Sequence, residues 1–455
     1  MQSVSVMIGI NPPAVRAPGS MALAAASPAP HFIVAFTGLS SEEPLAGGVR
    51  LMPITAKSDA AAYVPHAASA MPASDRLMSL DVMRGLVMVL MAVDHVRVYS
   101  GLPAGGPTPG IFFTRWITHF VAPAFCFLAG TAAYLHGRKL GDMRALSRFL
   151  VTRGIVLVLL ELTVIRVAWT FNFDFKHYML GGVIWMLGVC MILLASLVRF
   201  STRAIAIFGL VVIFAQQLVA LPAQAMSETV RGAVGWIWQF LYFGGQVHLG
   251  HDGPTLSILY VIVPWIGVMA AGYAFGAIML RPREERRRLC LRIGLSATAL
   301  FVVVAGTMVL TRPAQPNDPP ALFRFLGQQK YPASQLFLLM TLGPMIALLP
   351  LAERARGPVA RALAVFGRVP MFYYLLHIPV IHSLAVVVSL IRQGSVTPWL
   401  FGNHPMQPPE QPPGYMWSLG LLYLVFAVAI AILYPLCMWY AGVKARRKDS
   451  WLRYI

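Results

Sequence analysis

The sequence predicts an all-α polytopic membrane protein with about ten transmembrane helices, and three observations support this prediction. Hydrophobic residues make up 58% of the 455 residues and charged residues 12%, whereas soluble domains are about 25% charged. Apolar stretches of about 20 residues, the length that crosses a bilayer, recur along the chain. Lys and Arg outnumber Asp and Glu by 36 to 17, but they lie in short blocks between the apolar stretches. This pattern excludes a soluble enzyme and indicates topology signals rather than a nucleic-acid-binding surface.

The N-terminal segment 1–75 differs from the rest of the chain. It is rich in Ala, Pro, Ser and Gly and contains no apolar run long enough to cross a bilayer. It also lacks the basic, apolar and small-residue succession of a signal peptide. We expect either a disordered extension or a wrongly assigned start, in which case translation begins at Met71 or Met78. Residues 76–455 then form one transmembrane domain.

Within that domain, apolar windows mark the expected helices in order. They lie at 82–101, 112–135, 151–169, 179–198, 204–221, 256–280, 293–311, 335–352, 371–391 and 416–440.

The segments between these windows alternate in basic content. One set holds 22 Lys or Arg residues and comprises 136–153, 199–203, 281–292, 353–368 and 441–455. The other set holds 9 and comprises 97–115, 166–178, 222–255, 312–334 and 392–415. Because cytoplasmic loops carry the excess of basic residues, the first set and both termini are predicted to be cytoplasmic. The 30 Arg against 6 Lys, with abundant Ala, indicate a GC-rich bacterial genome and hence a bacterial cytoplasmic (inner) membrane.

The first window carries the densest set of charged residues. Each charge at membrane depth costs about 2.5–3.5 kcal/mol, which makes it a candidate for function. Arg84 and His95 are eleven residues apart, about three helical turns, so they share a face and lie roughly 16 Å apart along the axis. The alternative is that Arg84 reaches to cytoplasmic phosphates while His95 packs in the core.

A second group of polar residues gathers at the outer end of the first two windows. Arg115 and His119 share a helix face near Asp94, His95 and Arg97. His95 and His119 are candidate general bases, and Asp94 is placed to orient His119. Arg97 and Arg115 are candidates to stabilise an oxyanion or to bind an anionic acceptor. The alternative is a structural ion pair between Asp94 and one arginine.

Metal chemistry is not indicated. The four cysteines lie in or beside apolar stretches, which predicts neither disulfides nor a thiolate cluster. His248, His251 and Asp252 have metal-ligand spacing but no further strong ligand group, so we predict no metal. His377 is predicted to be a core residue or to support the site indirectly, and Glu161 to make a polar contact with Arg166 or another helix.

Three long strings resemble known membrane acyltransferases. Arg84 and His95 form the Arg-x10-His pattern of the acyltransferase-3 family. The string SLDVMRGLVMVLMAVDHVR, with TRWITHFVAPAFCFLAGTAAYL and FGRVPMFYYLLHIPVIHSL, is similar to the heparan-alpha-glucosaminide N-acetyltransferase catalytic domain of bacterial proteins. The similarity covers about 76–440.

This resemblance implies an acyltransferase of about ten helices. Such an enzyme takes cytoplasmic acyl-CoA, with acetyl-CoA as the expected co-substrate, and acylates a glycan or small acceptor on the far side. Arg84, Arg148 and Arg153 are then candidates to bind the phosphates of coenzyme A. The family's lysosomal enzyme places a histidine in the loop after the first helix, and 101–110 contains none, so acyl transfer is implied as a class rather than glucosamine N-acetylation.

Two alternatives from other classes remain at this stage. Intramembrane Arg84, Asp94 and His95 also suit the relay of a secondary transporter, although the interrupting prolines do not repeat in two halves of the chain. A non-catalytic membrane scaffold is the other alternative.

Overall fold

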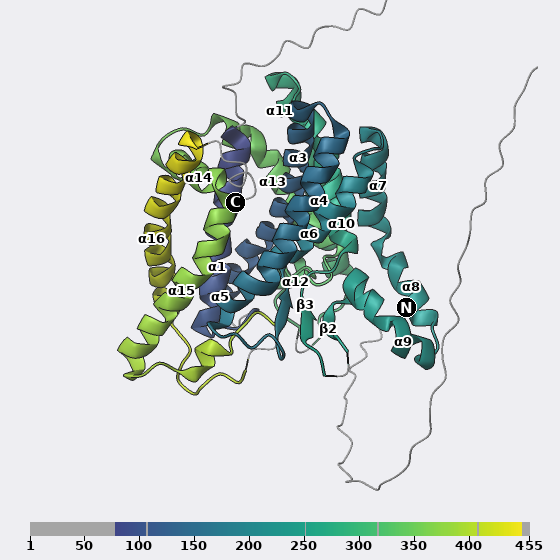
Figure 1. Cartoon of the computed structure of the whole chain (residues 1–455). Helices are drawn as coiled ribbons and strands as arrows, with labels where there is room; N and C mark the ends of the chain where they lie inside the picture. The colour runs from purple at the N-terminus through teal and green to yellow at the C-terminus, as the bar shows by residue number, and fades with distance from the viewer. Residues whose placement is uncertain (1–77, 106–107, 251, 316–317, 407–408, 448–455) are drawn as a thin grey trace, which may run out of the picture. The chain divides into compact units, whose positions relative to one another are not determined.

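The structure is a computed structural model that describes residues 78–105, 108–250, 252–315, 318–406 and 409–447, so the predicted extension 1–75 lies outside the described residues. The described chain is mostly helical (Figure 1). Its helices are α1 Met78–Ser100, α2 Pro109–Trp116, α3 Val121–Leu140, α4 Met143–Leu160, α5 Arg166–Thr170, α6 Val183–Leu197, α7 Thr202–Ala215, α8 Ala220–Ala225, α9 Glu228–Trp238, α10 Val263–Met279, α11 Arg283–Thr311, α12 Ala321–Leu326, α13 Gln335–Arg354, α14 Pro358–Arg368, α15 Pro370–Gln393 and α16 Leu419–Arg446. Its strands are β1 Met179–Gly181, β2 Gly245–His248 and β3 Thr255–Ile258.

Each of the ten predicted windows contains a helix. Among the described residues, six helical segments are long and apolar enough to cross a membrane, judged by length and composition. They are Pro109–Leu140, Thr202–Ala225, Arg283–Thr311, Gln335–Arg354, Pro370–Gln393 and Leu419–Arg446. Helices α6 and α10 are apolar but shorter, and α1 carries the charged residues singled out above. An integral membrane protein is therefore supported, while the number of spans stays a prediction.

A small sheet departs from the all-α prediction. β3 pairs in parallel with β1 and antiparallel with β2. The windows predicted as helices from 179 and from 256 therefore begin with strands, and helices α6 and α10 start later. Hydropathy averaged over a long window does not distinguish a buried strand from the first turn of a buried helix. Gly182 before α6 and Pro264 in the first turn of α10 mark the true starts.

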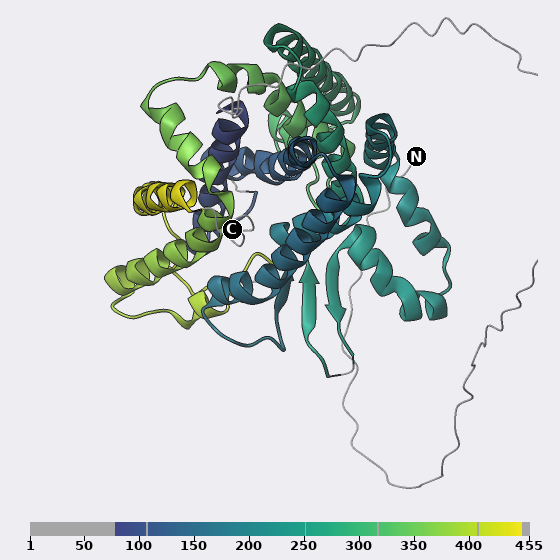
Figure 2. The ribbon, with the colours of Figure 1, turned by 45° about the horizontal axis from the view of Figure 1, so that its top comes forward.

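Helix α1 lies among helices from the far end of the chain. It contacts α14, α15 and α16, and also α3 and α13. Figure 2 shows α1 in purple beside the green and yellow C-terminal helices. Other close pairs are α3 with α10, α10 with α7, α4 with α6, and α11 with α13. Residues of the first window are thus brought against residues near 370 and 440.

Two glycines allow α1 and α14 to approach at backbone distance. A Cβ atom at Gly85 of α1 would lie 1.8 Å from the carbonyl oxygen of Leu363, and one at Gly367 of α14 would lie 1.8 Å from that of Asp81. Any side chain at either position would push the helices apart. The contact determines which part of α14 lies against the turn of α1 that carries Arg84.

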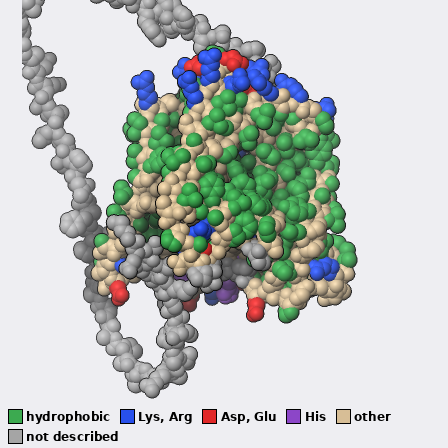
Figure 3. All heavy atoms as spheres, turned by 180° about the vertical axis from the view of Figure 1, so that it is seen from behind, with side chains coloured by type: hydrophobic (Ala, Val, Ile, Leu, Met, Phe, Trp, Pro, Cys, Tyr) green, Lys and Arg blue, Asp and Glu red, His purple; other side chains and the backbone are tan. Residues whose placement is uncertain are grey.

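The surface of the described chain has the character of a lipid-facing protein. Figure 3 shows a belt of hydrophobic side chains, with Lys and Arg gathered at one end of the molecule. Large apolar side chains on the long helices are largely exposed, as at Leu310, Leu351 and Ile391. In water such a surface would be costly, whereas in a bilayer it is the expected one.

Candidate active site

A cavity of about 780 Å³ opens between α1, α3, α4, α6, α14, α15 and α16. Its deeper walls are apolar and include Met88, Phe125, Leu157 and Met371. Tyr374 of α15 also lines it. The volume lies within the usual range of about 300–1,000 Å³ for sites that enclose a small molecule or cofactor.

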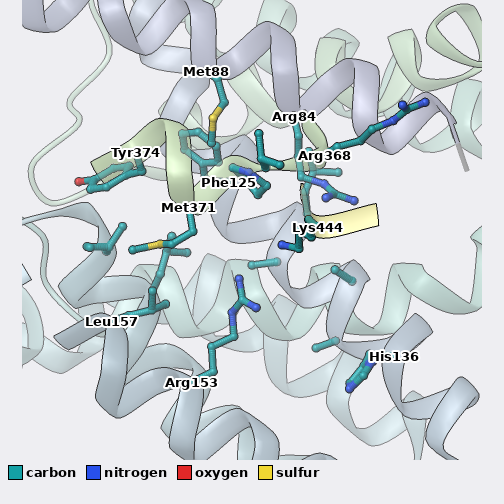
Figure 4. A pocket seen from close by; sticks show the side chains of 18 of the residues that line it. Arg84, Met88, Phe125, His136, Arg153, Leu157, Arg368, Met371, Tyr374 and Lys444 are labelled. Atoms are coloured by element: carbon teal, nitrogen blue, oxygen red, sulfur yellow. The ribbon is translucent and has the colours of Figure 1, made fainter. Parts of the chain in front are cut away.

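Cationic side chains line the same cavity. Arg84, Arg153, Arg368 and Lys444 come from α1, α4, α14 and α16, and His136 joins them from α3. Figure 4 shows the Arg84, Arg153 and Lys444 side chains directed toward a common space. Arg84 is held by a hydrogen bond from Nη1 to the Gly367 carbonyl oxygen, 3.2 Å, and by an ion pair with Asp81. Arg84, Arg153 and Lys444 thus bring guanidinium and ammonium groups together from three helices, and such groups are suited to bind phosphates.

The three arginines predicted from the sequence to bind phosphates do not all meet. Arg84 and Arg153 line the cavity. Arg148 lines a separate groove of about 510 Å³ with Arg144 and Arg199. Arg148 and Arg153 are five residues apart and so project about 140° apart around α4.

His95 lies three helical turns after Arg84 on α1 and forms a hydrogen-bonded pair with His377 of α15. His95 Nδ1 is 2.7 Å from His377 Nε2, and His377 Nδ1 is 2.6 Å from the carbonyl oxygen of Tyr374. His377 is fully buried, whereas His95 is partly exposed and packs against the edge of Trp169. The prediction that His377 supports the site indirectly is consistent with this contact.

These hydrogen bonds determine where the protons lie on neutral imidazoles. A carbonyl oxygen accepts but does not donate, so His377 Nδ1 must carry the hydrogen that bonds to Tyr374. His377 Nε2 therefore has the lone pair and accepts the hydrogen on His95 Nδ1. His95 Nε2 is then left with a lone pair, the form required of a general base.

Asp94 is paired with two arginines. Its Oδ1 accepts from Arg97 Nε at 3.1 Å and its Oδ2 accepts from Arg115 Nη1 at 3.0 Å. The ion pair considered from the sequence is thus present twice. The side chains of Asp94, Arg97 and Arg115 remain 18%, 11% and 11% exposed, so solvent still reaches the group.

His119 stands apart from Asp94. Its Nδ1 is 2.9 Å from the carbonyl oxygen of Trp116 and donates to it, and its ring packs against Phe337. No hydrogen bond between Asp94 and His119 is present in the described chain; the Trp116 carbonyl orients this imidazole instead. His119 Nε2 therefore also carries a lone pair, so hydrogen bonding alone leaves both histidines competent as bases.

The other polar residues considered from the sequence are not among the described residues that line the cavity. Glu161 accepts backbone hydrogen bonds from Ile184 and Trp185 at the start of α6, so it contacts another helix rather than Arg166. Arg166 bonds instead to nearby carbonyl groups, that of Tyr178 among them. Within the described residues no three His, Cys, Asp or Glu side chains gather as metal ligands, and His251 lies outside them.

Several residues of the cavity and of the cluster around Asp94 were not predicted from the sequence. Arg368, Lys444 and His136 of the cavity lie far apart in sequence, and their convergence depends on helix contacts that hydropathy does not specify. Lys330, which interacts electrostatically with Asp94 and Arg115, precedes α13 in a segment expected to be a loop. Its residue type was a usable signal, because lysine is scarce in a chain that otherwise uses arginine.

Comparison with known proteins identifies the family of the chain. The family model described as "Heparan-alpha-glucosaminide N-acetyltransferase, catalytic" matches residues 76–314, slightly more than half of the chain. No curated protein sequence matches significantly. The matched range contains every site residue predicted from the sequence, whereas Lys330, Arg368, His377 and Lys444 follow it. On this match the chain belongs to the heparan-alpha-glucosaminide N-acetyltransferase catalytic-domain family.

Proposed function

We propose that the protein is a transmembrane acyltransferase that moves an acyl group, with acetyl as the expected one, from cytoplasmic acyl-CoA to an acceptor outside the membrane. The acceptor is a glycan or another small molecule with an amine or hydroxyl group. The observation that carries the proposal is the cavity with cationic walls, because it joins a phosphate-binding composition to an apolar interior. A bacterial cytoplasmic membrane is the proposed location.

The cavity suits both the phosphates and the pantetheine arm of acyl-CoA. Arg84, Arg153, Arg368 and Lys444 supply the charge that the phosphates require, and arginine also offers bidentate hydrogen bonds. The neutral pantetheine arm would lie along Met88, Phe125 and the neighbouring apolar side chains. We propose that the thioester lies near Tyr374, which lines the cavity and whose carbonyl oxygen accepts from His377, the partner of His95.

His95 is proposed as the general base. Its Nε2 would take the proton of the acceptor amine or hydroxyl as that group attacks the thioester carbonyl carbon, and the thiolate of coenzyme A would leave. A proton gained by His95 leaves a cation whose Nδ1–H bonds to a neutral imidazole, His377. Asp94, Arg115 and Lys330 act on both histidines, but the adjacent Asp94 carboxylate has the larger effect at His95, and the two cations have the larger effect at His119. These surroundings favour His95 over His119.

Binding of the donor can be tested without turnover. Coenzyme A or acetyl-CoA is expected to raise the thermal stability of the detergent-purified protein, by about 2.7 kcal/mol at a hundred times Kd. Arg84→Ala or Arg368→Ala should weaken binding about tenfold and remove about 1.4 kcal/mol of this stabilisation. Arg84→Lys should recover little if the phosphate contact is bidentate.

Arg148→Ala is the matched control, because this arginine lies on α4 beside the cavity-lining Arg153 but faces the other groove. It should keep the full shift. Absence of stabilisation by any coenzyme A species at millimolar concentration would contradict the proposal and favour a transporter.

The proposed topology has ten spans with both termini in the cytoplasm. All four cysteines, Cys126, Cys190, Cys290 and Cys437, are buried, so background labelling by an impermeant maleimide should be low. Cysteine placed at exposed Glu228 or Glu410 should be labelled in intact cells, and cysteine at exposed Arg288 only after permeabilisation. Protection of both outer positions, or labelling of Arg288→Cys in intact cells, would refute this topology.

A further inference from the structure

Lys330 is a buried basic residue that has no role in the reaction proposed above. It lies in the turn before α13 and is 7% exposed. Its Nζ is 5.2 Å from the centre of the Tyr331 ring and 5.9 Å from that of Tyr260. In the described part of the chain, no carboxylate forms an ion pair with it. The two rings attract the ammonium but do not neutralise its charge.

The surroundings of Lys330 are dominated by other cations. Arg115 and Asp94 are its charged neighbours, and Arg97 shares Asp94 with Arg115. Three basic side chains thus lie near one carboxylate and the Tyr331 hydroxyl, which leaves an excess of positive charge in a largely buried cluster. Uncompensated buried charge is costly, so a cluster of this kind is a functional candidate.

The buried Lys330 ammonium indicates that the cluster binds an anion. Burial, assisted by the nearby Arg115 guanidinium, lowers the pKa of the Lys330 ammonium. An anion placed beside it would favour the charged form and would offset the excess charge of the arginines. The side chains of Asp94, Arg97 and Arg115 keep 11–18% of their surface exposed, so the cluster is not fully enclosed by protein.

From this geometry we infer that Lys330, Arg97 and Arg115 bind an anionic group of the acceptor, a carboxylate, sulfate or phosphate, next to His95. Asp94 accepts from both guanidinium groups and holds them in place. Arg97 Nη1 also donates to the Leu102 carbonyl oxygen and Arg115 Nη1 to Thr118 Oγ1, so the ligand would bind through remaining donors such as Arg97 Nη2. The assignment of the anion to an acceptor rests on the proposed function, whereas the anion site itself does not.

The anion site is tested first without turnover. Sodium sulfate should raise the melting temperature of the purified full-length protein above that in sodium chloride of equal ionic strength. Lys330→Met should lower the apparent affinity for sulfate about tenfold, as expected for the loss of one charge-assisted contact. Lys176→Met, at an exposed lysine on the same proposed side, is the control and should bind sulfate as the wild type does.

Failure of sulfate to stabilise the wild type, or an unchanged response of Lys330→Met, would overturn the site whether or not the protein transfers acyl groups. If Lys330→Met does not fold, Lys330→Gln takes its place, since it keeps length and polarity but removes the charge.

Turnover then tests whether the anion belongs to the acceptor. With an acceptor that the enzyme acylates and a counterpart that differs from it by one sulfate, Lys330→Met should raise KM about tenfold for the sulfated member alone. An equal loss of kcat for both would instead assign Lys330 to the oxyanion and overturn the inference. Loss of the thermal shift by coenzyme A in Lys330→Met would assign the anion to the donor and overturn it as well.

Discussion

Replacement of His95 by alanine is expected to lower the turnover number for acyl transfer by about 10² to 10⁴, the range found when a general base is removed. The reason is the position of the proton: the contact with His377 places the hydrogen on His95 Nδ1 and leaves Nε2 to accept the proton of the acceptor. Initial rates of coenzyme A release from acetyl-CoA, with saturating donor, would measure the effect.

His119→Ala is the paired variant for this experiment. His119 has an available Nε2 as well, but its Nδ1 bonds to a backbone carbonyl, and the Lys330 and Arg115 cations act on it more strongly than the Asp94 carboxylate does. Its removal should cost less turnover than removal of His95. The thermal shift by coenzyme A should survive in both variants, because neither histidine lines the cavity. Near wild-type turnover in His95→Ala, with an inactive His119→Ala, would transfer the role to His119.

Helix periodicity predicted the arrangement of residues within one helix well. Arg84 and His95 were expected on one face of the first span, and the structure directs Arg84 into the cavity and His95 toward His377. The proximity of Arg115 to Asp94 was also predictable, since they lie near adjoining ends of two consecutive predicted spans. Local spacing and topology signals contain this information.

Contacts between distant helices could not be predicted in the same way. His377 is 282 residues from His95, and no pattern within α1 specifies which helix faces it. The approach depends on glycines such as Gly85 and Gly367, which let α14, and with it the start of α15, come close to α1. A glycine in an apolar helix has many roles, so its partner cannot be read from one sequence.

The small sheet was missed for a different reason. The residues of β1 and β3 are apolar and adjoin apolar helices, so a window of about 20 residues averages across the boundary. The sheet lies in segments that the predicted topology assigns to the outside. It joins the segment before α6 to the one before α10, and thereby fixes the entry to two helices, one of which, α6, lines the cavity.

The second large effect is expected at His377, which acts through His95 and is therefore a positioning residue. His377→Leu removes the acceptor for His95 Nδ1–H, so the neutral imidazole is free to adopt the wrong tautomer. We expect kcat to fall about 10- to 100-fold, by analogy with histidines that lose the group orienting them. KM for acyl-CoA should change little, since His377 does not line the cavity.

His377→Gln separates positioning from packing. A glutamine amide can accept from His95 Nδ1 with its oxygen and donate to the Tyr374 carbonyl with its nitrogen, as the imidazole does. It should therefore restore a large part of the kcat lost in His377→Leu, although it fills the buried site less well. If leucine and glutamine instead lower kcat equally while both variants remain folded and bind coenzyme A, His377 does not set the tautomer of His95. The shared loss would then point to the shape of the imidazole ring beside Tyr373 and Tyr374.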